Sequence, residues 1–178
     1  MRKYFLAIIV IIAVIFVSGC IGGETTSQYS TDIKMTSKDG VVIKYPSDWV
    51  ISESTSNNSI ISVSDSKSID SSKIAQVNVN VERKKLDMPI DTFVNQTNTA
   101  LSKNPSFNLI SSGKVLVGQH EAIEVIYTSD SNGTVKMHKA IWIEHNGDVV
   151  AILCTAPQEQ FDSYDAIFNF IINNIELK

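Results

Sequence analysis

The sequence predicts an α+β protein in which two helices cover both faces of one antiparallel sheet. Two Asn-Gly pairs, at 132–133 and 146–147, separate apolar runs in the manner of tight β-hairpins. Two other stretches place apolar residues at helical spacing, one before this run of strands and one after it. Because a meander separates the two helices, each is expected to pack on a different face of the sheet.

Five strands are expected before the first helix. Asp39-Gly40 is a tight-turn pair that joins the first two strands, and Pro46 ends the second because proline cannot donate to a ladder. The fifth strand alternates between apolar and polar residues, which predicts one buried face. The expected ranges are 33–37, 41–45, 49–54, 60–66 and 74–82.

The first helix is expected to follow this strand. Asp91 is a credible N-cap, with Ile90 before it as a hydrophobic staple, and 103–105 (Lys-Asn-Pro) ends the helix. Its apolar face consists of Phe93, Val94, Thr97 and Leu101.

The meander and a second helix complete the chain. The last strand is apolar on both parities, which predicts a central strand that is covered on both faces. Pro157 introduces a helix at 158–173 with a wide apolar stripe, which must pack on the sheet. The expected strands of the meander are 109–117, 121–129, 135–144 and 148–155.

The N-terminus has the layout of an export signal. Arg2 and Lys3 precede an apolar run of about 14 residues, and Val-Ser-Gly then leads to Cys20. This order resembles the lipobox of prokaryotic lipoproteins, which implies cleavage before Cys20 and a diacylglyceryl group on its sulfur. The run is shorter than the roughly 20 residues of a spanning helix, the alternative interpretation. Residues 1–19 are therefore expected to be a signal peptide, 20–32 a lipidated cysteine with a flexible tether, and 33–178 the folded domain.

Charge and cysteine content exclude some functions. The 178 residues carry 15 Lys and Arg against 19 Asp and Glu, and no basic face accumulates, which argues against nucleic acid as a partner. The second cysteine, Cys154, lies in an apolar run and is expected to be a buried free thiol.

The order of elements resembles the Mog1/PsbP-like superfamily over residues 33–177. The matched positions are Tyr45, Pro46, Trp49, Gly118, Val125, Tyr127, Ala156, Phe161, Tyr164, Phe168, Ile171 and Ile172. The resemblance implies a three-layer α-β-α sandwich with an antiparallel sheet. It also implies non-enzymatic binding roles, as in extrinsic subunits of photosystem II, a Ran-binding protein and many lipoproteins.

Candidate chemistry is sparse. Pairing of neighbouring strands could bring His138 near a carboxylate such as Glu124, a combination that suits zinc or copper, but no clustered metal motif supports it, and a lone His on a strand is usually structural or solvent-facing, so no metal is expected. No nucleophile or phosphate-loop motif is present, so neither catalysis nor a cofactor is expected. Five aromatic residues either line a pocket for an apolar ligand or fill the core: Trp49, Tyr127, Trp142, Tyr164 and Phe168.

These observations favour a lipid-anchored, extracytoplasmic binding or accessory domain on the outer face of the cytoplasmic membrane. It would act without catalysis on a protein partner in the cell envelope, through loops or an exposed sheet face. The alternative is a carrier of a lipid or another small apolar ligand. The host is either a bacterium or an archaeon.

Overall fold

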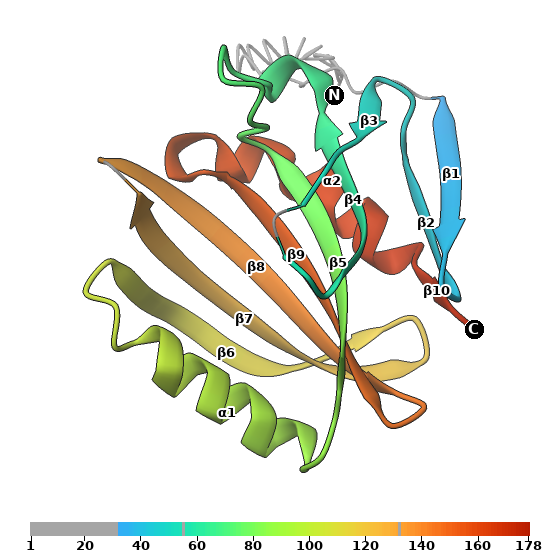
Figure 1. The fold of residues 1–178 in the computed structure, drawn as a ribbon, viewed down its shortest axis with the longest axis vertical. Helices are drawn as coiled ribbons and strands as arrows, with labels where there is room; N and C mark the ends of the chain where they lie inside the picture. The colour runs from blue at the N-terminus through green and yellow to red at the C-terminus, as the bar shows by residue number, and fades with distance from the viewer. Residues whose placement is uncertain (1–31, 55, 132) are drawn as a thin grey trace, which may run out of the picture.

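A computed structural model of the chain describes residues 32–54, 56–131 and 133–178 (Figure 1). The expected signal peptide, Cys20 and the tether up to residue 31 lie outside the described residues. Within them, ten strands, two α-helices and two 3-10 turns alternate along the chain. Their bounds are β1 (Ile33–Lys38), β2 (Val41–Pro46), β3 (Trp49–Ile51), β4 (Ser59–Asp65), η1 (Ser66–Ser68), β5 (Asn78–Lys85), α1 (Ile90–Leu101), β6 (Phe107–Val117), β7 (His120–Ser131), β8 (Thr134–His145), β9 (Asp148–Pro157), η2 (Gln158–Gln160), α2 (Phe161–Asn173) and β10 (Glu176–Leu177).

The predicted α-β-α arrangement is confirmed. Seven antiparallel strands pair in the order β3-β4-β5-β9-β8-β7-β6, with α1 on one face and α2 on the other (Figure 1). The meander of β6 to β9 is also confirmed. At its last turn, Asn146 and Gly147 both have positive φ, 53° and 75°, as a type I′ hairpin turn requires.

The main core lies between the sheet and α2. Trp49 and Phe168 are 1% and 0% exposed there, and they pack with aliphatic residues of β2, β4, β5 and β9. Strand β9 is buried on both faces, as its apolar composition predicted. Cys154 is a fully buried free thiol on this strand, which confirms its expected role as a small apolar residue.

The expectation of a single sheet is wrong, because the first hairpin forms a sheet of its own. The β1-β2 pair extends to a third strand, β10, in which Glu176 pairs with Val42 and Leu177 with Val41. Val41, Ile43 and Tyr45 of β2 belong to the core under α2. A two-residue strand has no periodicity, so the sequence alone could not predict β10.

Two element starts also differ from prediction. Pro89 occupies the N-cap position of α1, and Asp91 lies in the first helical turn, where its carboxylate still suits the helix dipole. The strand expected at 74–82 begins only at Asn78, because Ala75 forms an isolated bridge with Ile69 in the preceding loop. Neither helix of the described residues is long and apolar enough to cross a membrane.

Candidate binding surfaces

The two helices separate the five predicted aromatic residues into two groups. Tyr164 and Phe168 belong to α2 and Trp49 packs beneath it; the ring of Phe168 meets Trp49 edge-on at 6.4 Å and stacks with Tyr164 at 6.0 Å. Trp49 and Phe168 are fully enclosed in the core. In this layer the aromatic rings therefore fill space between sheet and helix.

Tyr127 and Trp142 lie on the opposite face, beside α1. They line a pocket of about 190 Å³ together with the apolar side chains of Leu101, Val125 and Leu153, among others. Burial, and then the Glu82 carboxylate that also lines the pocket, raises the pKa of Tyr127 to about 12. The volume is smaller than that of typical ligand pockets, which begin near 300 Å³.

His138 lies next to this layer in a short polar chain that crosses three strands. Its Nδ1 is 2.9 Å from the Thr155 hydroxyl, its Nε2 is 2.8 Å from the Ser129 hydroxyl, and its ring stacks on Tyr127 at 4.6 Å. Because a hydroxyl can donate or accept, both nitrogens of a neutral imidazole are satisfied. Burial, and then the charge of Lys136, lowers the pKa of His138 to about 4.

The structure does not pair His138 with Glu124, the carboxylate that the sequence offered as a neighbour. In the register of β7 and β8, His138 lies opposite Tyr127, whereas Glu124 lies opposite Ile141. Because 124 and 127 differ in parity, the two side chains project from opposite faces of the sheet. No group of three His, Cys, Asp or Glu side chains within the described ranges is placed to share a metal ion.

The sheet face on the α1 side carries a groove of about 800 Å³ over β3, β4 and β5, with both polar and aliphatic side chains in its lining. Its floor is a hydrogen-bonded network: the Ser52 hydroxyl lies 2.9 Å from that of Ser62 and 2.6 Å from that of Ser64. The side chain of Asn80 accepts from Ser59 at 2.6 Å and donates to Glu82 at 2.7 Å. Four exposed aliphatic residues border this floor: Val50, Ile51, Ile69 and Ile74.

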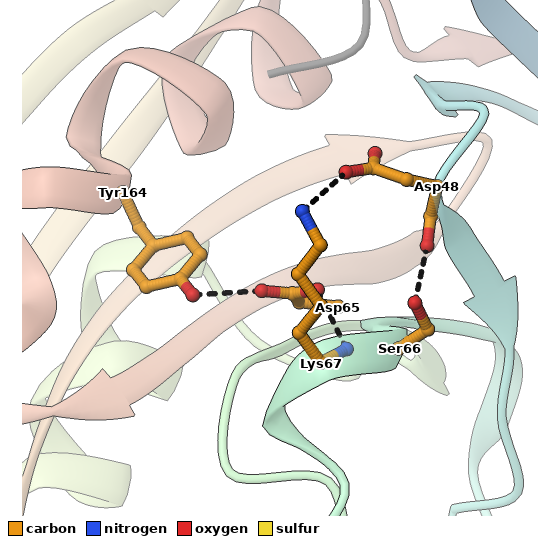
Figure 2. Close-up of polar contacts among 5 residues, drawn as sticks. All are labelled: Asp48, Asp65, Ser66, Lys67 and Tyr164. Carbon is orange, nitrogen blue, oxygen red and sulfur yellow. Dashed lines mark hydrogen bonds and ion pairs between the residues drawn. The ribbon is translucent and has the colours of Figure 1, made fainter. Parts of the chain in front are cut away.

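A buried carboxylate connects the sheet to α2 (Figure 2). The side chain of Asp65 accepts from the hydroxyl of Tyr164 at 2.7 Å and from the backbone N–H of Lys67 at 2.9 Å. Next to it, the Ser66 hydroxyl donates to the carbonyl of Asp48, and the Lys67 ammonium pairs with the Asp48 carboxylate at 3.6 Å. The contacts of Tyr164 and Asp65 give this cluster a structural role.

Asp65 was not among the candidate site residues that the sequence pattern indicated. The only signal was the placement of an Asp before Ser-Lys-Ser, which is typical of a capped turn. A second polar contact holds α2 from the residue after Tyr164, where the buried Lys139 of β8 donates to the side chains of Asp165 and, one turn on, Asn169. These residues are also absent from the sequence-based candidates, because their meeting depends on how α2 lies across the sheet.

Strand β6 forms one end of the seven-stranded sheet and has no strand on its outer side among the described residues. It is 11 residues long, contains no proline, and has Lys114 as its only charged residue. Three of its apolar side chains are exposed, Leu109 by 45%, Ile110 by 50% and Leu116 by 72%. A bulge at Ile110 interrupts its pairing with β7, and the register is continuous from Ser111 to Val117.

Comparison with solved structures gives the fold a PsbP-like identity. The solution structure of CyanoP, the PsbP of the cyanobacterium Synechocystis, superposes with a TM-score of 0.61 at 12% identity and covers 91% of this chain and 99% of its own. LpqN of Mycobacterium tuberculosis, which is involved in cell envelope biogenesis, gives 0.58 at 14% identity over 85% of this chain and 99% of its own. A protein of unknown function from Pseudomonas aeruginosa gives 0.53 at 13% identity, covering 80% and 94%. No family model and no curated protein matches the sequence. The domain therefore has the PsbP-like fold that the residue pattern resembled.

Proposed function

We propose that this protein is a lipid-anchored accessory domain on the outer face of the cytoplasmic membrane, and that it binds an extended segment of a protein partner along β6. The lipobox-like sequence up to Cys20 supports the anchor and the location. The fold is shared with LpqN, a protein of cell envelope biogenesis, and with CyanoP, which fits an accessory role in an envelope.

The exposed edge of β6 is the observation that carries the binding role. An unpaired edge presents rows of N–H and C=O groups, and natural proteins usually blunt such an edge with charges, prolines or short strands. Here one lysine and one bulge are the only such features in 11 residues. An added strand would satisfy the edge backbone from Ser111 to Val117, and Leu116 would contribute an apolar contact.

Site-specific crosslinking on intact membranes tests this proposal. A photo-reactive residue at Leu116 is compared with one at Met35 of β1, which is similarly exposed but lies in the other sheet. We expect one discrete crosslinked product from position 116 that is absent from position 35. Leu116→Glu should abolish co-purification of that partner. Equal patterns from both positions, or no product from position 116, would refute binding at β6.

The anchor has its own test. Cys20→Ala removes the only sulfur that the lipobox offers for lipid attachment. We expect the variant to leave the membrane fraction or to remain unprocessed. A cleaved variant that still sediments with membranes after a salt wash would refute the lipid anchor.

A second function, carriage of a small apolar ligand, is supported by the pocket beside Tyr127 and Trp142. Its lining is largely apolar, and a dry apolar cavity of about 150 Å³ is large enough to hold benzene. Native mass spectrometry of the protein purified gently from its host tests it. A discrete added mass that Trp142→Ala removes would establish a carrier, whereas a bare chain mass would eliminate it.

A further inference from the structure

The loop of residues 66–77 lies beside the point where the chain enters the domain. The carbonyl of Asp32, the first described residue, accepts from the backbone N–H of Ser47 at 2.8 Å. Asp48 follows Ser47 in the chain; its backbone carbonyl accepts from the Ser66 hydroxyl, and its carboxylate pairs with the Lys67 ammonium (Figure 2). These contacts connect the chain entry to the loop. Figure 1 shows the start of β1 and this loop at the upper end of the molecule.

The loop is held in one conformation and presents apolar side chains to solvent. The carboxylate of Asp70 accepts from the backbone N–H groups of Ser72 and Ile74 at 2.8 and 3.0 Å and from the side chain of Gln76 at 2.8 Å. Ile74 is nevertheless 57% exposed, and Ile69 and Ile51 beside it are also exposed. A preorganised apolar surface binds without the entropic cost of ordering it first.

A lysine occupies the apex of this loop in a conformation that favours glycine. Lys73 has a φ of 62°, and its backbone N–H donates to the carbonyl of Asp70 at 2.9 Å to close the turn. Left-handed φ is unfavourable for a residue with a Cβ, because the Cβ comes too close to the following carbonyl oxygen. Lys73 is exposed, so the strained position places a cation next to the exposed isoleucines.

From this arrangement we infer that the tip formed by Ile51, Ile69, Lys73 and Ile74 docks on the bilayer surface, with the lysine on anionic headgroups. This inference rests on the proposed lipid anchor. Asp32 follows Cys20 by 12 residues, a length of chain that cannot exceed about 40 Å. The tip therefore stays within reach of the bilayer, and exposed aliphatic side chains with an adjacent cation suit the boundary between headgroups and acyl chains.

Docking by the tip would also orient the proposed partner site. Figure 1 shows α1 and β6 toward the lower end of the molecule, away from the chain entry. With the tip on the bilayer, the outer edge of β6 would remain in water and accessible to a partner.

A fluorescent probe on the full-length lipidated chain tests the docking. Ile74→Cys and Leu116→Cys are each labelled with the polarity-sensitive dye NBD and reconstituted into vesicles of phosphatidylcholine and phosphatidylglycerol. Cys154 does not compete for the label, because it is fully buried and burial raises the pKa of its thiol. We expect the emission at position 74 to shift to the blue and to be quenched by spin-labelled lipid, while position 116 reports water.

The outcomes separate the docking from the anchor. Failure of the full-length chain to float with the vesicles would refute the anchor, and the docking proposal would fall with it. Flotation with the dye at position 74 still in water would refute the docking alone. Equal quenching at both positions would also refute it, because the domain would then have no preferred orientation.

A matched pair of lysine variants tests the charge contribution. Lys73→Gly removes the cation while relieving the left-handed φ, so the fold should be as stable or more stable. One lysine near an anionic surface contributes about 1 kcal/mol, so the ratio of the docked to the undocked population, measured from the amplitudes of the two probe lifetimes at position 74, should fall about fivefold. Lys103→Ser, two residues after α1, removes another exposed lysine and should leave the ratio unchanged. An equal effect of the two variants would overturn the role of Lys73.

Discussion

Replacement of His138 by glutamine should remove a large part of the acid sensitivity of this fold. The imidazole is held between the hydroxyls of Ser129 and Thr155 and stacked on Tyr127, so it is neutral in the native state. Burial, with a smaller contribution from Lys136, lowers its pKa to about 4. Protonation would place a charge among groups that are already satisfied by a neutral ring.

The sign and size of the effect follow from the two pKa values of His138. The folded value, about 4, is below the ordinary value of 6.5, so the unfolded chain binds the proton more tightly. The stability conferred by the neutral ring is complete above pH 6.5 and declines as the pH falls toward 4. When the pH is lowered from about 8 to about 5, the titration of His138 alone should reduce the free energy of unfolding by about 2 kcal/mol.

Urea unfolding followed by circular dichroism at both pH values measures this difference. Carboxylates also titrate in this range, so the informative quantity is the loss in the wild type minus the loss in His138→Gln. We expect the wild type to lose about 2 kcal/mol more than the variant. Parallel losses would show that His138 is not buried in its neutral form. A histidine proton resonance that is missing from the variant should titrate near pH 4 in the wild type.

Two further predictions concern the polar contacts of α2. Tyr164→Phe leaves the buried carboxylate of Asp65 without its hydroxyl donor and should lower the unfolding free energy by about 1–3 kcal/mol in urea titrations; an unchanged midpoint would contradict the structural role of this contact. Asp165→Ala should destabilise the protein by about 2 kcal/mol, because it deprives a buried ammonium of its charged acceptor. Lys139→Met should cost less than Asp165→Ala, since it removes the buried charge and leaves a half-exposed carboxylate that water can solvate. A larger loss for Lys139→Met would reverse this interpretation.

The parts of the fold that were predictable are those with local signals. At 146–147, Asn-Gly predicts a tight turn because both residues accept positive φ, and the structure has both there. Strand β9 is apolar on both parities, and this composition alone indicated a central position between two helices. Each of these signals comes from residues that are neighbours in the chain, so no knowledge of long-range packing was needed.

The features that escaped prediction depend on register and on distant contacts. The hydrogen bond between Asp65 and Tyr164 joins residues 99 positions apart. His138 and Glu124 do not meet, because the register between β7 and β8 decides which of their residues project from the same face of the sheet. A shift of the register by one residue would move every side chain of a strand to the other face. The position of β6 at the edge of the sheet could not be predicted either, because the order of strands along the chain does not determine their order in the sheet.

Helix α2 buries more residues against the sheet than helix α1 does, and this difference bears on which side of the sheet can change conformation on binding. Five residues of α2 are buried, and the contacts at Tyr164 and Asp165 add polar ties to the sheet. Helix α1 buries only Val94 completely. Elements with few buried contacts open at lower free energy than the rest of a domain. Because residues of α1 line the pocket beside Trp142, we expect α1 to adjust to an occupant more readily than α2.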